Sequence, residues 1–238
     1  VADLAEVADA KTVFRFLNKG DTITVGVKEP KNLVELKSAL EGQQLFDGTP
    51  LCKHIKEVAY EIKSMKWELE KNKQKAVVVI TTDGISSDGD VKEALKLLEG
   101  LPVWVVYKLC TEVIIPVSYW HNVAKSINVE CDVLDSLHAE AMEIQDFNQW
   151  LVYGIPLQHL REFGIFHPEL DHLDDHSVDK DHMRVALSAI LGGDIVDYPD
   201  PETDWNAFKS LVQSKLSKSS KVWDPRRQKM KPWVSLNK

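Results

Sequence analysis

The chain has no excess of basic residues and few cysteines, and each absence excludes a class of protein. Its 29 Lys and Arg residues face 37 Asp and Glu residues, which leaves a formal net charge of -8 over 238 residues. This charge argues against nucleic acid as a partner, because the phosphate backbone is bound mainly through Lys and Arg. The three cysteines, Cys52, Cys110 and Cys131, show no CxxC spacing, and an odd number cannot pair fully within one chain. Their number and spacing favour a reducing compartment.

Long apolar segments are also missing. No stretch reaches the ~18 consecutive apolar residues of a membrane span. The first residues, "VADLAEVADAK", lack the basic start and apolar core of a signal peptide. We therefore expect a protein without a membrane span, located in the cytoplasm or in another intracellular compartment.

Motifs for nucleophilic catalysis and nucleotide binding do not occur. The chain has no Gly-x-Ser-x-Gly elbow, no Walker loop and no Gly-x-Gly-x-x-Gly turn after a strand. Cys110 and Cys131 lie in or beside apolar strand patterns, and we interpret both as buried thiols of a core. The sequence thus favours a non-catalytic protein over these enzyme classes.

The pattern of apolar residues predicts an α/β fold. "TVFRFL" and "TITVGV" alternate apolar and polar residues like the strands of a hairpin, and helices are expected over residues 31–41 and from Pro50 onward. "AVVVITT" is apolar enough for a parallel strand buried on both faces, and "PVWVVYKL" and "INVECDVL" follow with helices between them. Such alternation predicts a mainly parallel, doubly wound (Rossmann-like) sheet.

The pattern changes near residue 149, so we expect a domain over residues 1–148 and a C-terminal extension over residues 149–238 that packs on it. "MRVALSAILGG" predicts a helix ended by glycines. The last part, from "DYPDPETDWNAFKS" onward, contains prolines and three tryptophans with little regular period. It predicts an irregular tail whose tryptophans anchor it by burial.

Two loops at predicted strand ends stand out together: "FDGTPL" before the long helix and "TTDGISSDGD" after the buried strand. Their order and content resemble the von Willebrand factor type A (vWA) domain over residues 1 to about 148. This resemblance implies a protein-interaction module, not an enzyme, with a metal-ion-dependent adhesion site at the carboxyl edge of the sheet.

The resemblance also implies the ligands of that site. Thr49 would bind Mg²⁺, or Mn²⁺ or Ca²⁺ in its place, and Asp83 would coordinate the ion directly or through water. Ser86 and Ser87 would supply hydrogen bonds around the ligands, and Gly84 would let the backbone turn beneath the ion. An acidic side chain of a protein partner would complete the coordination. Oxygen donors of this kind suit Mg²⁺, which usually keeps several waters.

One motif of the vWA family, Asp-x-Ser-x-Ser after the first strand, does not occur in the chain. Either the first strand and its loop precede Val1, or the chain is a degenerate member whose metal site is weak or absent, so that it holds no cofactor. Taken singly, Asp83 and Thr49 also have an ordinary structural interpretation. An aspartate at a strand end often caps the next helix, and Thr49 before Pro50 is a good N-cap.

A second candidate site lies in "HPELDHLDDHSVDKDH". His172 and His176 stand at i and i+4, so on a helix both imidazoles would reach one transition metal. This segment would support a metal-dependent hydrolase, although a solvated loop also explains it. A third interpretation is a metal-independent subunit of a larger assembly, into which the tail would dock.

Overall fold

The computed structural model describes residues 1–18, 22–41, 48–165, 167, 170 and 173–236. The chain forms two compact units. The first comprises Val1–Leu134 together with Glu162–Gly164, and the second comprises Asp135–Arg161 and Ile165–Lys238. The chain therefore changes unit after Leu134, and the predicted division after residue 148 stays a prediction. Each unit is described by itself.

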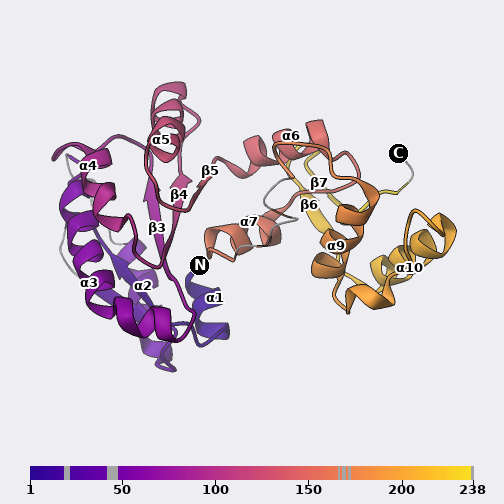
Figure 1. Ribbon diagram of the computed structural model, residues 1–238, viewed down its shortest axis with the longest axis horizontal. Helices are drawn as coiled ribbons and strands as arrows, with labels where there is room; N and C mark the ends of the chain where they lie inside the picture. Colours follow the sequence, from indigo (N-terminus) through magenta and orange to yellow (C-terminus); the bar gives the residue numbers. More distant parts are fainter. Residues whose placement is uncertain (19–21, 42–47, 166, 168–169, 171–172, 237–238) are drawn as a thin grey trace. The chain divides into compact units, whose positions relative to one another are not determined.

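The first unit combines a hairpin, a parallel sheet and helices (Figure 1). In chain order its elements are α1 (Ala2–Val7), β1 (Thr12–Arg15), β2 (Thr22–Val25), α2 (Pro30–Glu41), α3 (Leu51–Lys71), β3 (Ala76–Thr82), α4 (Val91–Leu95), the 3-10 helix η1 (Lys96–Leu98), β4 (Val103–Leu109), α5 (Ile114–Ser126) and β5 (Cys131–Leu134). The predicted hairpin is confirmed, since β1 pairs with β2 in antiparallel fashion. Its connecting residues 19–21 lie outside the described residues.

The sheet has the order β3-β4-β5 and all of its strands are parallel. Ala76 lies opposite Val103, and Thr82 lies opposite Leu109. The predicted α/β fold with a parallel sheet flanked by helices is therefore confirmed, and the arrangement is compatible with a Rossmann-like fold. Because the strands are parallel, the loops that follow them emerge at one edge.

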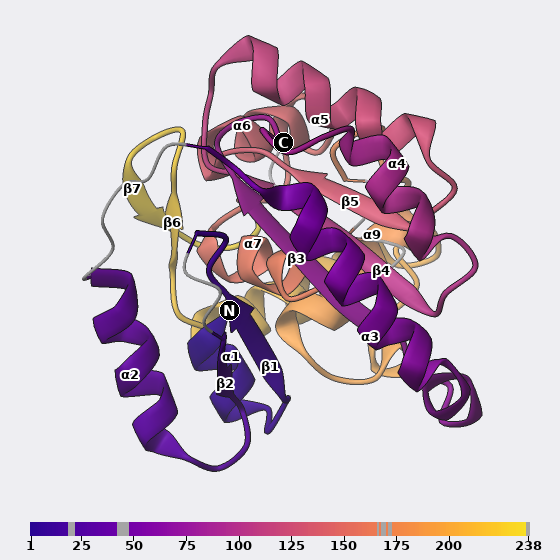
Figure 2. The ribbon, with the colours of Figure 1, turned by 90° about the vertical axis from the view of Figure 1, so that its left-hand side faces the viewer.

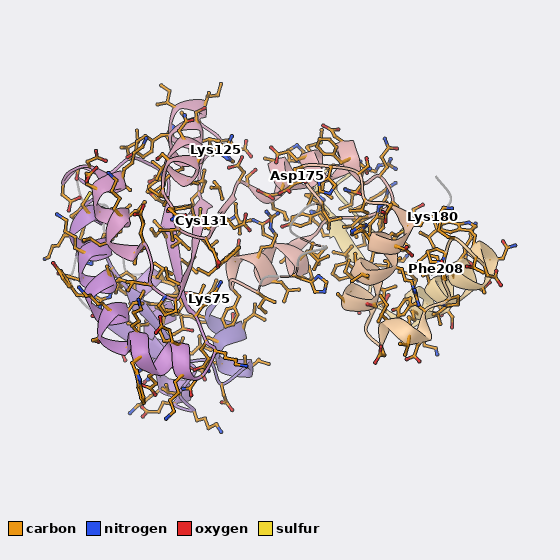
Figure 3. The ribbon with its side chains drawn as sticks, viewed as in Figure 1. Lys75, Lys125, Cys131, Asp175, Lys180 and Phe208 are labelled. Carbon is orange, nitrogen blue, oxygen red and sulfur yellow. The ribbon has the colours of Figure 1, made fainter. Side chains whose placement is uncertain are left out.

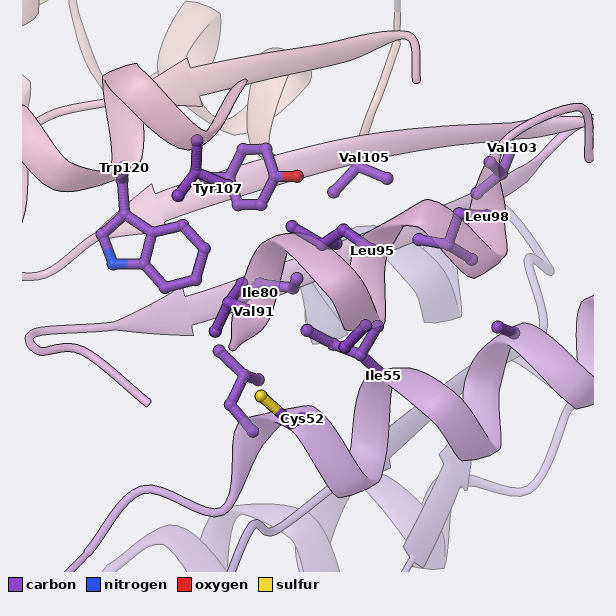
Figure 4. Close-up of a cluster of buried hydrophobic side chains, with 14 of the residues drawn as sticks. Cys52, Ile55, Ile80, Val91, Leu95, Leu98, Val103, Val105, Tyr107 and Trp120 are labelled. Carbon is purple, nitrogen blue, oxygen red and sulfur yellow. The ribbon is translucent and has the colours of Figure 1, made fainter. Parts of the chain in front are cut away.

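The core of the first unit lies between this sheet and its helices (Figure 4). Tyr107 and Trp120 are completely buried, and their ring centroids are 5.2 Å apart. Apolar positions of α3 and α4 pack against them because both helices place every third or fourth residue on one face. The buried helical members of this cluster are Leu51, Cys52, Ile55, Ala59, Ile62, Val91, Ala94, Leu95, Leu98, Trp120 and Val123.

A short segment far along the chain belongs to the first unit. Lys108 of β4 forms a 3.3 Å ion pair with Glu162. Phe163 packs against the small cluster formed by the hairpin, α1 and α2. Gly164 lies so close to Val77 that an added Cβ would come within 2.4 Å of the valine side chain. Residues 162–164 thus pack against both the parallel sheet and the hairpin cluster.

The second unit has its own core and mainly helical elements. They are α6 (Leu137–Phe147), α7 (Ile155–Glu162, whose last residue belongs to the first unit), α9 (Lys180–Leu191), the 3-10 helix η2 (Ile195–Asp197), α10 (Trp205–Lys218), β6 (Val222–Asp224) and β7 (Lys229–Lys231). Arg161 forms ion pairs with Glu140 at 2.6 Å and Asp174 at 3.0 Å. The predicted helix ended by glycines is confirmed as α9, with Gly192 at φ +74°.

The prediction of an irregular tail from residue 197 onward is wrong for Trp205–Lys218, which forms α10. Asp204 caps this helix by accepting a hydrogen bond from the amide of Ala207, and Phe208 and Val212 are buried. Figure 3 labels Phe208 among the side chains of this unit. Trp205 and Trp233 pack against the core as expected, whereas Trp223 is exposed. Prolines before α10 obscured the period of its apolar residues, and tertiary packing favours the helix.

In the part of the chain that the structure describes, every helix is too short or too polar to cross a membrane.

Two neighbouring leucines test the core of the first unit. Leu95 is completely buried, whereas Leu97 is substantially exposed. Leu95→Ala is expected to lower the free energy of unfolding by about 2–5 kcal/mol, because it removes packed methyl groups and leaves a cavity. Leu97→Ala is the matched control and is expected to cost under about 1 kcal/mol. Urea unfolding followed by tryptophan fluorescence measures both, and equal losses would contradict the assigned core.

Candidate functional site

The loops after β3 and β4 meet at the carboxyl edge of the parallel sheet. Asp83 follows β3, and Cys110 follows β4. The Cys110 amide donates a 2.9 Å hydrogen bond to the carbonyl of Thr82. Burial raises the pKa of the Cys110 thiol; the positive charge of Lys108 opposes this shift, and the negative charge of Asp83 adds to it. Cys110 is nevertheless exposed as a residue, so its interpretation as a buried core thiol is wrong.

The two loops singled out in the sequence lie against each other. The Thr49 amide donates a 2.7 Å hydrogen bond to Oγ of Ser87, and the Ser87 amide donates one of 2.9 Å to the Thr49 carbonyl. Oγ of Ser86 donates a longer bond, 3.3 Å, to the same carbonyl. Ser86 and Ser87 therefore tie the loop of Thr49 to the loop that contains Asp83.

Asp88 holds the start of α3. One carboxylate oxygen, Oδ1, accepts hydrogen bonds of 2.9 Å from the Cys52 amide and 2.6 Å from Oγ of Ser86. The other, Oδ2, accepts one of 2.9 Å from the Lys53 amide. Free amides at a helix start need acceptors, and the N-cap residue, Pro50, makes no side-chain cap. Sequence reasoning missed Asp88 because a cap normally comes from residues just before its helix.

These contacts shift the titration of Asp88. Partial burial raises its pKa, but hydrogen bonds from Ser86 and from the amides of Lys53 and Cys52 outweigh that effect. The net result is a pKa lowered from 3.8 to about 2. The hydrogen bonds favour the charged carboxylate, so Asp88 is ionised at neutral pH.

Asp83 does not cap the next helix, which is the structural task that an aspartate at a strand end often has. It is exposed, and within the described part of the chain its carboxylate makes no hydrogen bond or ion pair. The next helix, α4, is capped by Asp90, whose side chain accepts from the amide of Lys92. The loop is nevertheless held in place, because Trp120 donates a 2.9 Å hydrogen bond from Nε1 to the Gly84 carbonyl. Asp83 thus presents a free carboxylate on an anchored loop.

Two smaller expectations about these loops are corrected. Thr49 does not act as the side-chain N-cap of α3; its backbone is bound by the serines, and Asp88 supplies the cap. Gly84 does not adopt a positive φ, and an added Cβ would meet no atom within 4 Å. The turn at Gly84 therefore does not require glycine.

Exposed apolar residues lie at the same edge of the sheet. Val113, which precedes α5, and Ile114 and Ile115, which begin it, are 60%, 79% and 72% exposed. Ile85 in the loop after β3 is also exposed. Three consecutive β-branched residues in solvent are unusual, and grouped exposed apolar side chains are typical of interaction surfaces.

The metal-binding potential of this edge is limited to a few oxygen donors. Thr49 and Asp83 carry donors of the type that Mg²⁺ uses, and Mg²⁺ retains several waters. Among the residues that the structure describes, no group of three or more His, Cys, Asp and Glu side chains could hold a metal ion. The chemistry of the two residues therefore fits a hard cation, while most of its coordination would come from water and from a partner.

The histidine-rich segment is only partly described, because His172 lies outside the described residues. His176 follows a turn and its side chain pairs with Asp175. Nδ1 of His182 lies 2.6 Å from Oδ1 of Asp179, which also caps α9. His176 and His182 thus interact with neighbouring aspartates, whereas Nδ1 of His167 is buried and has no hydrogen-bond partner among the described residues. A metal site in this segment stays a prediction.

Comparison of the chain with protein-family models, with curated proteins and with solved structures finds no match.

Asp83 and Asp88 form a matched pair for a stability test. Asp88→Ala is expected to lower the free energy of unfolding by about 1–2 kcal/mol, because it removes the acceptor for two amides of α3. Asp83→Ala is expected to change it by less than about 0.5 kcal/mol, since its carboxylate supports no contact. Chemical unfolding at pH 7 measures both values. A larger loss for Asp83→Ala would show that this residue has a structural task after all.

The stabilisation from Asp88 should depend on pH. Its pKa in the folded protein, about 2, lies below the ordinary value of 3.8. A lowered pKa stabilises the fold above the unfolded value, and this contribution is lost as the pH falls toward the folded value. The stability difference between the unchanged protein and Asp88→Asn is therefore expected to be constant from pH 5 to 7 and to shrink between pH 4 and 2. A difference that is the same at every pH would contradict this assignment.

Proposed function

We propose that the first unit is a non-catalytic protein-interaction module, similar in its site to a vWA domain, that binds partners at the carboxyl edge of its parallel sheet. The observation that carries the proposal is the exposed, uncommitted carboxylate of Asp83 on a loop whose neighbours are firmly bound. A residue kept free at such a position is available to a ligand.

The surroundings of Asp83 support binding rather than catalysis. Within the described residues, the Asp83 carboxylate forms no hydrogen bond with a base or a nucleophile. The edge instead combines a hard oxygen donor with the exposed side chains of Val113, Ile114 and Ile115. Apolar contact area beside a few directional polar groups is the usual composition of a protein interface.

A divalent cation gives Asp83 and Thr49 a shared task in this proposal. Mg²⁺ would take oxygen from both residues and water at other positions, and a partner's Asp or Glu would replace one water. The bound cation would attract an acidic partner to an edge that already carries negative charge. The serines would keep Thr49 next to the loop of Asp83 whether or not the ion is bound.

Isothermal titration of Mg²⁺ and Mn²⁺ into the full-length protein tests the cation. Binding is expected in the unchanged protein and is expected to weaken by at least about tenfold in Asp83→Ala and Thr49→Ala, because each variant removes an oxygen donor. Asp146→Ala, which removes an exposed carboxylate of the second unit, is the control and should bind as the unchanged protein does. Equal binding in all four proteins, or none in the unchanged one, would contradict the cation-dependent mechanism.

A further inference from the structure

One face of α3 is basic and aromatic along its whole length. Positions three or four apart share one side of a helix. The α3 stripe is defined here as Lys53, Lys56, Tyr60, Lys63, Trp67 and Lys71. All six residues are exposed, while Leu51, Ile55 and Ile62 of the same helix are buried. In Figure 2, α3 crosses on the viewer's side of β3 and β4.

The lysines of the α3 stripe are not neutralised within the unit. Elsewhere in the first unit, exposed lysines form ion pairs, such as Lys75 with Glu130 and Lys96 with Glu93. In the described part of the chain, none of the four stripe lysines forms an ion pair. Among the acidic residues of α3, Glu57 and Glu61 pair with Arg15, and Glu70 pairs with Lys66. A protein of net charge -8 thus carries four lysines without ion pairs along one helix.

Two large aromatic side chains interrupt this charge. Tyr60 is 66% exposed and Trp67 is 72% exposed. Nζ of Lys71 lies 4.9 Å from the Trp67 ring centroid, a cation–π distance. Tyrosine and tryptophan are the side chains that most often anchor protein interfaces, because they bury a large area with few rotatable bonds.

We propose that the α3 stripe is a docking surface for an acidic protein segment that carries apolar side chains. The four lysines would pair with its carboxylates, and Tyr60 and Trp67 would cover its apolar residues. At 1.5 Å per residue the stripe is about 27 Å long, which matches about five turns of a partner helix. The overall negative charge disfavours nucleic acid, whose phosphates are more densely charged than an acidic peptide.

This proposal does not rest on the cation at the carboxyl edge. Its surface comes from residues of α3 alone, and neither Asp83 nor Thr49 belongs to it. Binding at the stripe is therefore expected to persist in EDTA and in Asp83→Ala. The two proposals can fail separately.

A labelled peptide tests the stripe. The probe is a fluorescein-labelled 18-residue peptide with Glu at every third or fourth position and Leu and Phe between them. Fluorescence anisotropy with the full-length protein at low ionic strength is expected to show saturable binding that weakens as salt is added. Lys56→Glu/Lys63→Glu and Trp67→Ala are each expected to weaken it by about tenfold or more, because one reverses the charge and the other removes an aromatic anchor.

A second charge reversal is the matched control. Lys11→Glu/Lys125→Glu changes the net charge equally but leaves the α3 stripe intact; Figure 3 labels Lys125 on α5. At an ionic strength of about 0.15 M, where charges on the protein surface are screened beyond about 8 Å, it is expected to bind the peptide within about twofold of the unchanged protein. Circular dichroism confirms that each variant is folded before binding is measured.

Three outcomes would overturn the proposal. The first is no binding of the peptide by the unchanged protein, and the second is an equal loss in the stripe and control variants, which would reflect net charge alone. The third is tighter, stripe-dependent binding of oligouridylate or of phosphatidylserine vesicles than of the peptide. That result would assign the surface to nucleic acid or to a membrane.

Discussion

The arrangement of the candidate site depends on the clamp that Asp88 forms between a loop and a helix. Its carboxylate accepts from two amides at the start of α3 and from Ser86, so the helix and the loop after β3 are held together. Thr49 lies just before this helix and is bound to Ser87, which places it beside the loop of Asp83. Since α3 also packs its apolar face on the sheet core, the clamp joins the site to the most buried part of the unit.

Three aspartates within one loop differ in their contacts because they stand at different positions in it. Asp90 caps the helix that follows it, Asp88 caps a helix that precedes it, and Asp83 contacts neither. The first two remove the need for Asp83 as a structural acceptor. The proposed cation site uses the remaining free carboxylate, and the exposed side chains of Val113, Ile114 and Ile115 add apolar surface at the same edge.

Helix α3 connects the two proposed surfaces of the first unit. Its start is fixed beside Thr49, while its exposed side carries unpaired lysines and two aromatic residues. The helix can present them rigidly because its other side is buried against the sheet. A cation-dependent edge and a basic helix face would both recognise acidic partners, so together they would direct binding toward acidic protein surfaces in spite of the negative net charge.

The sequence by itself determined the elements whose signals are local. The periods of apolar residues located the hairpin, α3, the parallel strands and α9, because side-chain alternation follows directly from backbone geometry. The sequence also indicated that the loops of Thr49 and Asp83 belong together. The period failed for α10, where packing of Phe208 and Val212 favours a helix after a proline-rich stretch.

Only the tertiary structure decided which acidic residue caps which helix and which one stays free. Asp88 lies far along the chain from the amides it binds, and no local pattern encodes a contact at that separation. The return of residues 162–164 to the first unit has the same cause, since Glu162 pairs with Lys108, a residue far away along the chain. Local sequence sets backbone preferences, whereas partners distant in sequence are chosen by packing and by the need to satisfy buried polar groups.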